Sequence, residues 1–234
     1  MRYPIAEIFD SIQGEGVWTG TLMRFVRLAG CNVGEYTEPA ALQPLETDPQ
    51  SLRVLRASYP QHSVCTAFDG TQFLCDTDYH KTATMEAEDI VSALTTKHVC
   101  VTGGEPFLHD LGPLYDELPS DVTMHIETSG TKPISRGRFG TSDTWITCSP
   151  KAGFVPENGS RVDEWKFVVG KDTDVAKIEK FLDEVDYITG TVFLQPINGP
   201  EYMNRDSLLA VMDALQAHPT WRLSAQLNKF LGMR

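Results

Sequence analysis

Three cysteines in one long stretch of the chain have the residue type and the number of a metal site. Cys31 is separated from Cys65 by 33 residues (32–64), and Cys65 is separated from Cys75 by nine (66–74). Thiolates suit soft centres such as zinc or an iron–sulfur cluster. An odd number of thiols leaves one coordination position open, which is where chemistry can occur. The sequence therefore predicts that Cys31, Cys65 and Cys75 share a metal site with one vacant position.

The composition limits the kind of protein that carries this site. The 234 residues include 41% hydrophobic residues, enough for the core of one α/β domain spanning 1–234. A net charge of −12 argues against a nucleic-acid surface, which needs a basic patch. No signal peptide or run of about 20 apolar residues is evident, so we expect a cytoplasmic protein without disulfides. Cys100 and Cys148 lie in apolar runs and are expected to be small buried hydrophobic residues.

The elements that must position the cysteines follow from the hydrophobic periodicity. Apolar runs predict strands at about 22–28, 97–101, 122–126, 144–148, 164–169 and 191–194. Helical spacing predicts helices at 85–96, at 109–118, from a cap at Asp172 to about Val185, and at 205–217. This alternation predicts an α/β fold, a partial parallel barrel of about six βα units. The segment at about 33–72, with a short helix expected at 50–57, is predicted to be a long insertion over a cofactor.

Polar clusters follow several of the predicted strands directly. They are Cys31, Thr102–Pro106, Glu127–Gly130, Ser149–Lys151 and Gln195–Asn198. In a parallel barrel the carboxyl ends of the strands meet at one rim, where active sites of this architecture lie. We therefore expect these five clusters to converge on a single mouth.

Each cluster has a chemical interpretation and a plain structural one. Thr102–Pro106 exposes backbone amides beside a carboxylate and could hold the two ends of an amino acid, or it is a glycine-rich turn. Lys151 offers a cation, and Gln195 could pair with an adenine edge or end a strand. Asp76 and Thr77 offer the hard oxygen ligands that magnesium uses. Three thiolates on a cubane leave the fourth iron bare, and S-adenosylmethionine is an amino acid that could chelate it.

An ordered set of motifs resembles one family. The motifs are Glu7-Ile-Phe-x-Ser-Ile-Gln-Gly-Glu-Gly16, Phe25-Val-Arg-Leu-Ala-Gly-Cys-Asn32, Cys75-Asp-Thr77, Thr102-Gly-Gly-Glu-Pro106, Glu127-Thr128, Ser149-Pro-Lys151, Gln195-Pro196 and Trp221-Arg-Leu-Ser-x-Gln226. Together they resemble the 7-carboxy-7-deazaguanine synthases, which are radical S-adenosylmethionine enzymes. The resemblance covers the chain apart from roughly 33–72.

The resemblance implies a reaction and its accessories. The family contracts the ring of 6-carboxy-5,6,7,8-tetrahydropterin to give 7-carboxy-7-deazaguanine with loss of ammonia, a carbon–nitrogen lyase step that serves 7-deazapurine (queuosine) biosynthesis. It uses a 4Fe–4S cluster, S-adenosylmethionine and Mg²⁺. An electron donor such as flavodoxin and a homodimeric assembly are implied in the same way.

The resemblance also assigns residues by position. Cys31, Cys65 and Cys75 would hold the cluster, and Thr77 would ligate magnesium. The pterin would be contacted by Ile12, Gln13, Gly14, Glu15, Arg27, Thr102, Gln226, Asn228 and Arg234. S-adenosylmethionine would be held by Leu74, Asp76, Gly104, Glu105, Ser149, Pro150, Lys151, Gln195, Pro196, Ile197 and Asn198.

The sequence departs from the family pattern in two places. Most radical enzymes space their cysteines as C-x3-C-x2-C, but both gaps are long here, and Gln72 occupies the position of the middle cysteine. Cys65 is the only cysteine between Cys31 and Cys75, so it receives that role. Asn228 occupies a position where His is expected. Two other functions stay open at this point: another radical reaction, such as activation of a partner protein, and a non-catalytic zinc–thiolate binding module.

Overall fold

The computed structural model describes residues 1–37, 62–75, 77–135, 143–185, 190–198 and 203–233. The helix expected at 50–57 lies outside these residues. None of the helices in these ranges has the length and apolar character to cross a membrane.

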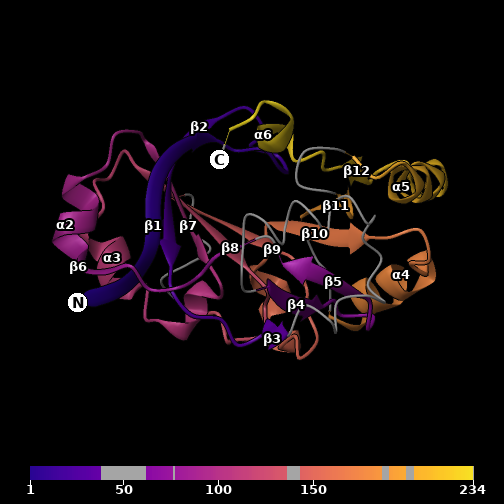
Figure 1. Ribbon diagram of the computed structural model, residues 1–234, viewed down its shortest axis with the longest axis horizontal. Coiled ribbons are helices and arrows are strands. Elements are labelled where there is room, and N and C mark those ends of the chain that lie inside the picture. The colour runs from indigo at the N-terminus through magenta and orange to yellow at the C-terminus, as the bar shows by residue number, and fades with distance from the viewer. Residues whose placement is uncertain (38–61, 76, 136–142, 186–189, 199–202, 234) are drawn as a thin grey trace.

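A nine-stranded sheet forms the body of the molecule (Figure 1). Its strand order is β12-β11-β10-β9-β8-β7-β2-β1-β6. Neighbouring strands from β2 to β12 are parallel, whereas β1 pairs antiparallel with both β2 and β6. The bounds are β1 Arg2–Ile12, β2 Leu22–Leu28, β6 Ala83–Glu86, β7 His98–Gly103, β8 Thr123–Thr128, β9 Thr144–Cys148, β10 Glu164–Val169, β11 Thr191–Pro196 and β12 Arg222–Leu223. The fold is therefore mixed α/β with a mostly parallel sheet, as predicted.

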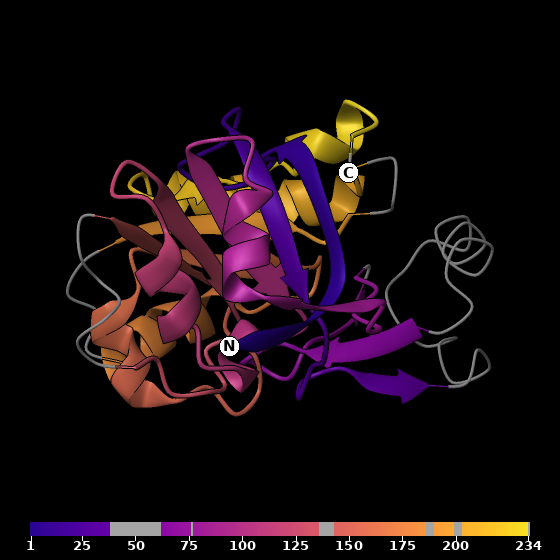
Figure 2. The ribbon, with the colours of Figure 1, turned by 90° about the vertical axis from the view of Figure 1, so that its left-hand side faces the viewer.

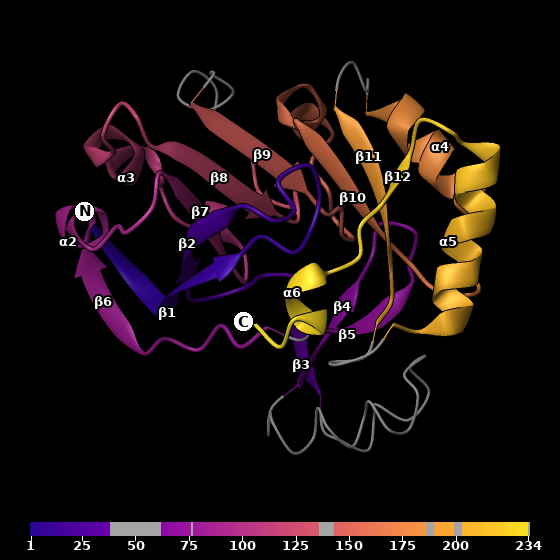
Figure 3. The ribbon, with the colours of Figure 1, turned by 90° about the horizontal axis from the view of Figure 1, so that it is seen from above.

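Helices cover one face of this sheet in two groups. Figure 3 shows one group at each end of the sheet. Near β1 and β2, α2 (Ala87–Ser92) and α3 (Gly112–Glu117) pack on Val26, Val101 and Ile126. At the other end, α4 (Val175–Glu184) and α5 (Arg205–Ala217) pack on Trp165, Phe167 and Leu194. Short 3-10 turns lie at η2 (Pro106–Leu108) and η3 (Pro156–Arg161), and a short helix, α6 (Leu227–Phe230), follows β12.

The opposite, inner face of the sheet carries the alternate residues of the same strands. Because side chains alternate along a strand, β10 directs Trp165 and Phe167 toward the helices and Glu164 and Lys166 to the inner face. Met23, Phe25 and Cys100 form a small apolar cluster on this face, and Phe9 and Trp18 pack against it. The Trp18 ring lies 4.8 Å from that of His125 and 5.8 Å from that of Trp145. The connection between β1 and β2 thus folds back and closes one end of the inner face.

A second, smaller sheet comes from the two described ends of the insertion. Its order is β3-β4-β5, all antiparallel, with bounds Glu35–Thr37, His62–Thr66 and Gln72–Cys75. Figure 2 shows it beside the main sheet, and Figure 1 shows it below that sheet with α6 above. The segment predicted only as a long excursion therefore contains regular strands at both of its ends.

Several predicted elements differ from the observed ones. The strands at 22–28, 144–148 and 164–169 and the helix at 205–217 are confirmed. The helix predicted at 85–96 is wrong at its start, because residues through Glu86 pair with β1 as the edge strand β6. The helix predicted at 109–118 begins only at Gly112. The cap of α4 is Asp174, which accepts from the Ala176 amide, and not Asp172.

Candidate active site

A cavity of about 280 Å³ lies at the carboxyl ends of the parallel strands. The predicted site residues that line it are Ile12, Gln13, Gly14, Glu15, Arg27, Cys31, Cys65, Cys75, Thr77, Thr102, Gly104, Ser149, Lys151, Gln195, Gln226 and Asn228. They come from both sheets and from the C-terminal segment, so the structure brings together clusters spread over more than 200 residues of sequence.

Strand pairing explains how Cys65 reaches Cys75 across nine residues. In the β4–β5 hairpin Cys65 pairs with Phe73, and Ser63 pairs with Cys75. Residues 63 and 65 therefore share a face with 73 and 75, so the two thiols are diagonal neighbours. Gln72 pairs with Thr66, lies on the opposite face and is exposed. The hairpin register thus presents Cys65, and not residue 72, beside Cys75.

Of the three thiols Cys65 is buried, whereas Cys31 and Cys75 are half-buried. The pKa of Cys65 lies far above its usual value, chiefly because of a hydrogen bond shared with Cys75 and because of burial. Negative charge on Cys75 and Cys31 acts in the same direction, and Lys151 opposes it. Among the described residues no group of three or more His, Cys, Asp or Glu side chains is arranged to hold a single metal ion. An iron–sulfur cluster binds each cysteine through a different iron. Its ligands therefore do not have to converge on one point, but they have to line the same cavity.

Gly104, the residue that follows β7, fixes the position of Cys31. A Cβ atom on Gly104 would lie 2.2 Å from the Gly30 carbonyl oxygen and 2.5 Å from the Cys31 Cβ. The Glu105 amide donates to that same Gly30 oxygen at 3.0 Å. Only glycine at position 104 lets the loop that carries Cys31 pack against the end of β7. The donor set fits a cluster, because three thiols line one cavity and thiolates are the ligands that iron–sulfur clusters use.

Glu105 is placed away from the cavity. Its carboxylate is fully buried and accepts hydrogen bonds from Thr128 Oγ1 at 2.7 Å, the Ser129 amide at 2.9 Å, the Ser129 hydroxyl and the Phe107 amide at 3.1 Å. These donors satisfy it and join the loops after β7 and β8. Glu105 therefore connects the loops of the rim, and it does not line the cavity.

Four further predicted residues in the described ranges do not line the cavity: Pro150, Pro196, Ile197 and Asn198. Alternation along β11 turns Gln195 toward the cavity and therefore Pro196 away from it. The Pro150 carbonyl accepts from the Phe68 amide, and Asn198 donates to Gln226 at 3.3 Å, so both act on neighbouring segments. The Leu74 side chain, Asp76 and Arg234 lie outside the described part.

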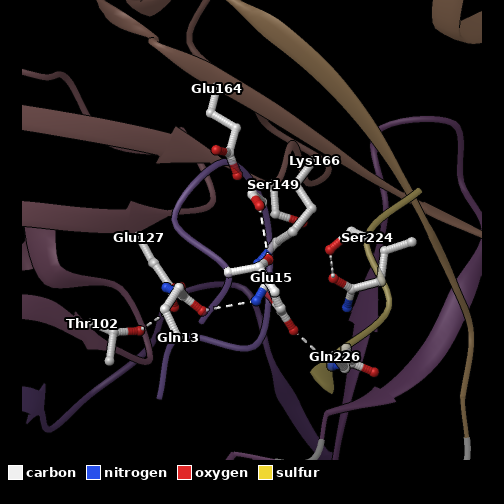
Figure 4. A network of polar contacts seen from close by, with 12 residues as sticks. Gln13, Glu15, Thr102, Glu127, Ser149, Glu164, Lys166, Ser224 and Gln226 are labelled. Carbon is white, nitrogen blue, oxygen red and sulfur yellow. Dashed lines mark hydrogen bonds and ion pairs between the residues drawn. The ribbon is translucent and has the colours of Figure 1, made fainter. Parts of the chain in front are cut away.

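A buried polar network forms the sheet wall of the cavity (Figure 4). Lys166 forms an ion pair with Glu15, whose other carboxylate oxygen accepts from Gln226 at 2.8 Å. Glu127 accepts from Gln13 at 3.1 Å and from the Thr102 hydroxyl at 3.1 Å. The network thus joins β1–β2, β7, β8, β10 and the C-terminal segment.

Lys166 and Glu127 hold each other in the ionised form. Burial alone lowers the pKa of Lys166, but the Glu15 and Glu127 carboxylates outweigh it and raise that pKa above its usual value. Burial raises the pKa of Glu127, but the Lys166 charge and the hydrogen bond from Gln13 bring it below its usual value. Glu164 lies deeper, accepts from the Val17 amide at 2.9 Å, and has a pKa that burial raises.

The loop between β1 and β2 packs against α6 in the C-terminal segment, beside the cavity. The Leu227 amide donates to the Gly14 carbonyl at 2.8 Å, and a Cβ on Gly14 would lie 1.9 Å from Asn228 Oδ1. A Cβ on Gly16, which has φ +69°, would lie 1.8 Å from the Glu164 carboxylate. Close packing on both sides of Glu15 therefore requires a glycine at positions 14 and 16.

Two basic side chains at the cavity have neighbours of their own. Arg27 Nε lies 2.8 Å from Glu7 Oε1, so the guanidinium is oriented by a carboxylate at its outer edge. Lys151 Nζ donates to the Ser149 hydroxyl at 2.7 Å and the Ser149 carbonyl at 2.8 Å, and it lies 5.4 Å from the centre of the Phe73 ring. Each can present an oriented positive charge to an anion.

Lys166 was missed as a site residue, although the sequence carries a signal for it. Glu164 and Lys166 stand at alternate positions of an otherwise apolar strand, which is unusual unless that face lines a polar interior. Glu127 was expected at the mouth, through the cluster Glu127–Gly130 and its motif, but was not assigned a contact. Ser129 belongs to the same cluster, whereas the cavity-lining Tyr79 and Lys229 carry no comparable local signal.

The fold and the site define a mixed α/β protein whose rim cavity combines three thiols with a buried network of charges. No protein-family model matches the chain. It is 33% identical over 240 residues to the 7-carboxy-7-deazaguanine synthase of Synechocystis sp., covering 100% of this chain and 95% of that one. It is 31% identical to the enzyme of that name from Escherichia coli K12, with full coverage of both. The crystal structure of QueE from E. coli is similar, with a TM-score of 0.66, 30% identity and coverage of 97% and 95%. The chain belongs to the 7-carboxy-7-deazaguanine synthase family.

Proposed function

We propose that the chain is a radical S-adenosylmethionine enzyme that contracts 6-carboxy-5,6,7,8-tetrahydropterin to 7-carboxy-7-deazaguanine with loss of ammonia. The observation that carries this proposal is that three cysteines and an ionised polar network line one cavity. The family to which the chain belongs supports the same reaction. In the organism the product would enter 7-deazapurine (queuosine) biosynthesis.

One wall of the cavity is proposed to hold the cofactors. Cys31, Cys65 and Cys75 would hold a 4Fe–4S cluster, and Gly104, Ser149, Lys151 and Gln195 would hold S-adenosylmethionine. When bound, this pair supplies one-electron cleavage of the sulfonium and hence a carbon radical able to abstract hydrogen. The protein's part is to orient both groups and to keep water away, which the buried position of Cys65 supports.

The other wall is proposed to hold the substrate. Arg27, oriented by Glu7, would bind the pterin carboxylate. The aminopyrimidinone edge of the pterin presents N–H donors, which the carboxylates of Glu15 and Glu127 would accept. Lys166 forms an ion pair with Glu15 and holds the pKa of Glu127 below its usual value. Gln13, Thr102 and Gln226 hold these carboxylates in place. Ile12, Gly14 and Asn228 would complete the pocket, with Arg234 as a further proposed contact.

The remaining features are proposed from general chemistry. Thr77 lines the cavity two residues after Cys75 and would be the magnesium ligand. A thiolate-held cluster needs reduced cysteines, which favours the cytoplasm. We also propose a homodimer, a donor such as flavodoxin, and one domain over 1–234 whose curved sheet is a partial barrel with an insertion at about 33–72.

The decisive experiment is a product assay. Protein reconstituted anaerobically with iron and sulfide is incubated with 6-carboxytetrahydropterin, S-adenosylmethionine, Mg²⁺ and a reductant. We expect 7-carboxy-7-deazaguanine and 5′-deoxyadenosine by mass spectrometry. Cleavage of S-adenosylmethionine without the deazaguanine product would contradict the proposed substrate and favour a different radical reaction. Zinc without iron or sulfide after anaerobic purification would contradict the cluster itself.

A further inference from the structure

The turn of the β4–β5 hairpin is attached to the body of the protein by backbone hydrogen bonds. The Phe68 amide donates to the Pro150 carbonyl at 3.3 Å, and the Ala152 amide donates to the Thr66 carbonyl at 3.0 Å. Ala67 forms an isolated antiparallel bridge with Lys151. The segment next to Cys65 therefore runs alongside the loop that follows β9.

A single aromatic side chain fastens the same turn. The Phe68 ring lies 4.8 Å from that of Phe181 on α4 and 5.3 Å, edge to face, from that of Phe167 on β10. Both partners belong to the core beneath α4 and α5, and Phe68 packs against that core. Phe68 thus connects a surface hairpin to the core behind the sheet.

Within the described part of the chain, Phe68 is the one large apolar side chain at the turn of this hairpin. The turn closes on itself, because the Ala67 amide donates to the Thr71 carbonyl at 2.8 Å and Asp69 accepts from the Thr71 amide and hydroxyl at 3.0 and 2.9 Å. Its other described tie to α4 is a 3.4 Å contact between Lys177 Nζ and the Asp69 carbonyl. Small sheets are marginal on their own, and backbone bonds at a surface exchange readily with water. Burial of an aromatic ring contributes more.

We propose that Phe68 is a positioning residue that keeps Cys65 at the cavity by anchoring the hairpin to the core. The inference rests on the proposed function in that Cys65 would there serve as a cluster ligand. When the hairpin opens locally, Phe68 leaves its partners. Truncating Phe68 therefore destabilises the closed state relative to the open one.

The first test uses the apoprotein and needs no cluster. Cys65 is 6% exposed, so its alkylation by a maleimide reports opening of the hairpin. In Phe68→Ala we expect Cys65 to be alkylated about tenfold faster or more than in the unmodified chain. Phe68→Leu, which keeps most of the apolar contact, should restore slow labelling. Peptide mass spectrometry resolves Cys65 from Cys31, which lies outside the hairpin and serves as internal reference.

A core substitution on the same cluster is the matched control. Leu182 on α4 is buried in the core that receives Phe68, but it lies outside the hairpin. Leu182→Ala should lower the melting temperature without accelerating Cys65 labelling, because it weakens the closed and the locally open states alike. Equal labelling rates in Phe68→Ala and the unmodified chain, or equal acceleration in Leu182→Ala, would overturn the inference.

The second test uses the reconstituted protein. Phe68→Ala should release iron to a chelator about tenfold faster than the unmodified chain, with rescue by Phe68→Leu. Failure of the unmodified chain to take up a cluster would count against the proposed function and leave the apoprotein result to decide the role of Phe68. A cluster that is equally stable in Phe68→Ala and in the unmodified chain would overturn the positioning role.

Discussion

The two ends of the inner face of the sheet are built from the same strands but from different chemistry. At the closed end, His98, His125, Trp18 and Trp145 pack ring against ring, with His98 Nδ1 3.0 Å from His125 Nε2. At the open end, the same strands continue to Thr102, Glu127 and Lys166, which line the cavity. On β8 a step of two residues, from His125 to Glu127, separates the closed aromatic layer from the ionised one, and on β7 four positions separate His98 from Thr102.

This contrast teaches where stability and chemistry are separated in the fold. At the closed end the rings pack tightly against one another and keep water out of the space beneath the cavity. The open end keeps Glu127 and Lys166 ionised although they are buried, because each stabilises the charge of the other. Substitutions at the open end should therefore abolish chemistry, whereas those at the closed end should change stability.

The largest effect is expected at the thiols. Cys65→Ala should remove one of three cluster ligands, so reconstituted protein should lose its visible cluster absorbance and all product formation. Cys100→Ala is the matched control, because Cys100 is also buried but packs with Met23 and Phe25 away from the thiols. Iron content, absorbance and turnover measure the outcome. A full cluster in Cys65→Ala would remove Cys65 from the ligand set.

A smaller effect is expected in the charge network. Lys166→Met leaves buried carboxylates without their counter-charge, which costs about 3–5 kcal/mol in free energy of unfolding. It should also disorder the substrate wall and reduce kcat/KM about 100-fold, while cluster absorbance is retained. Lys180→Met is the control, because Lys180 forms only an exposed pair with Glu184 at 3.6 Å. Loss of the cluster in Lys166→Met would contradict the separation of the two walls.

The sequence predicts those site residues whose role is visible from their immediate neighbours in the chain. It does not predict those whose role depends on a distant strand. Gly104 and Cys31 were found because they stand next to strand ends, and the structure explains Gly104 by its contact with Gly30. Glu105 was assigned to the cofactor because a carboxylate after two glycines suggests a ligand. Its hydrogen bonds to Thr128 and Ser129 come from the next strand, and their partners are set by packing that no single motif reveals.

The fold shows the same limit. Strands 144–148 and 164–169 were predicted with their observed bounds because a short, mainly apolar run is a local signal. The antiparallel edge β6 and the small sheet that carries Cys65 and Cys75 depend on pairing between distant segments. Cys65 was assigned by elimination, and the pairing of Cys65 with Phe73 supplies the physical reason.

The closed end offers a pH-dependent prediction of moderate size. Burial, with a contribution from the His98 charge, lowers the pKa of His125 to about 4. The unfolded chain titrates near its ordinary pKa of about 6.5 and so binds more protons between pH 6.5 and 4, which means that stability falls as pH falls through this window. The loss is at most about 3 kcal/mol from this residue. Urea unfolding of apoprotein His125→Gln between pH 7 and 4.5 should show a shallower decline, and an unchanged slope would contradict the assignment.

The smallest effect is expected where the usual cysteine spacing would place a ligand. In the double variant Cys65→Ala, Gln72→Cys, only two residues (73 and 74) separate the new thiol from Cys75 in place of nine, so spacing alone predicts recovery of the cluster. The hairpin register predicts none, because residue 72 pairs with Thr66 on the exposed face, opposite to Cys75. We therefore expect iron content and absorbance equal to those of Cys65→Ala alone. Recovery of a cluster would show that β5 changes its register when the cluster is assembled, since a one-residue shift carries every side chain of a strand to its other face.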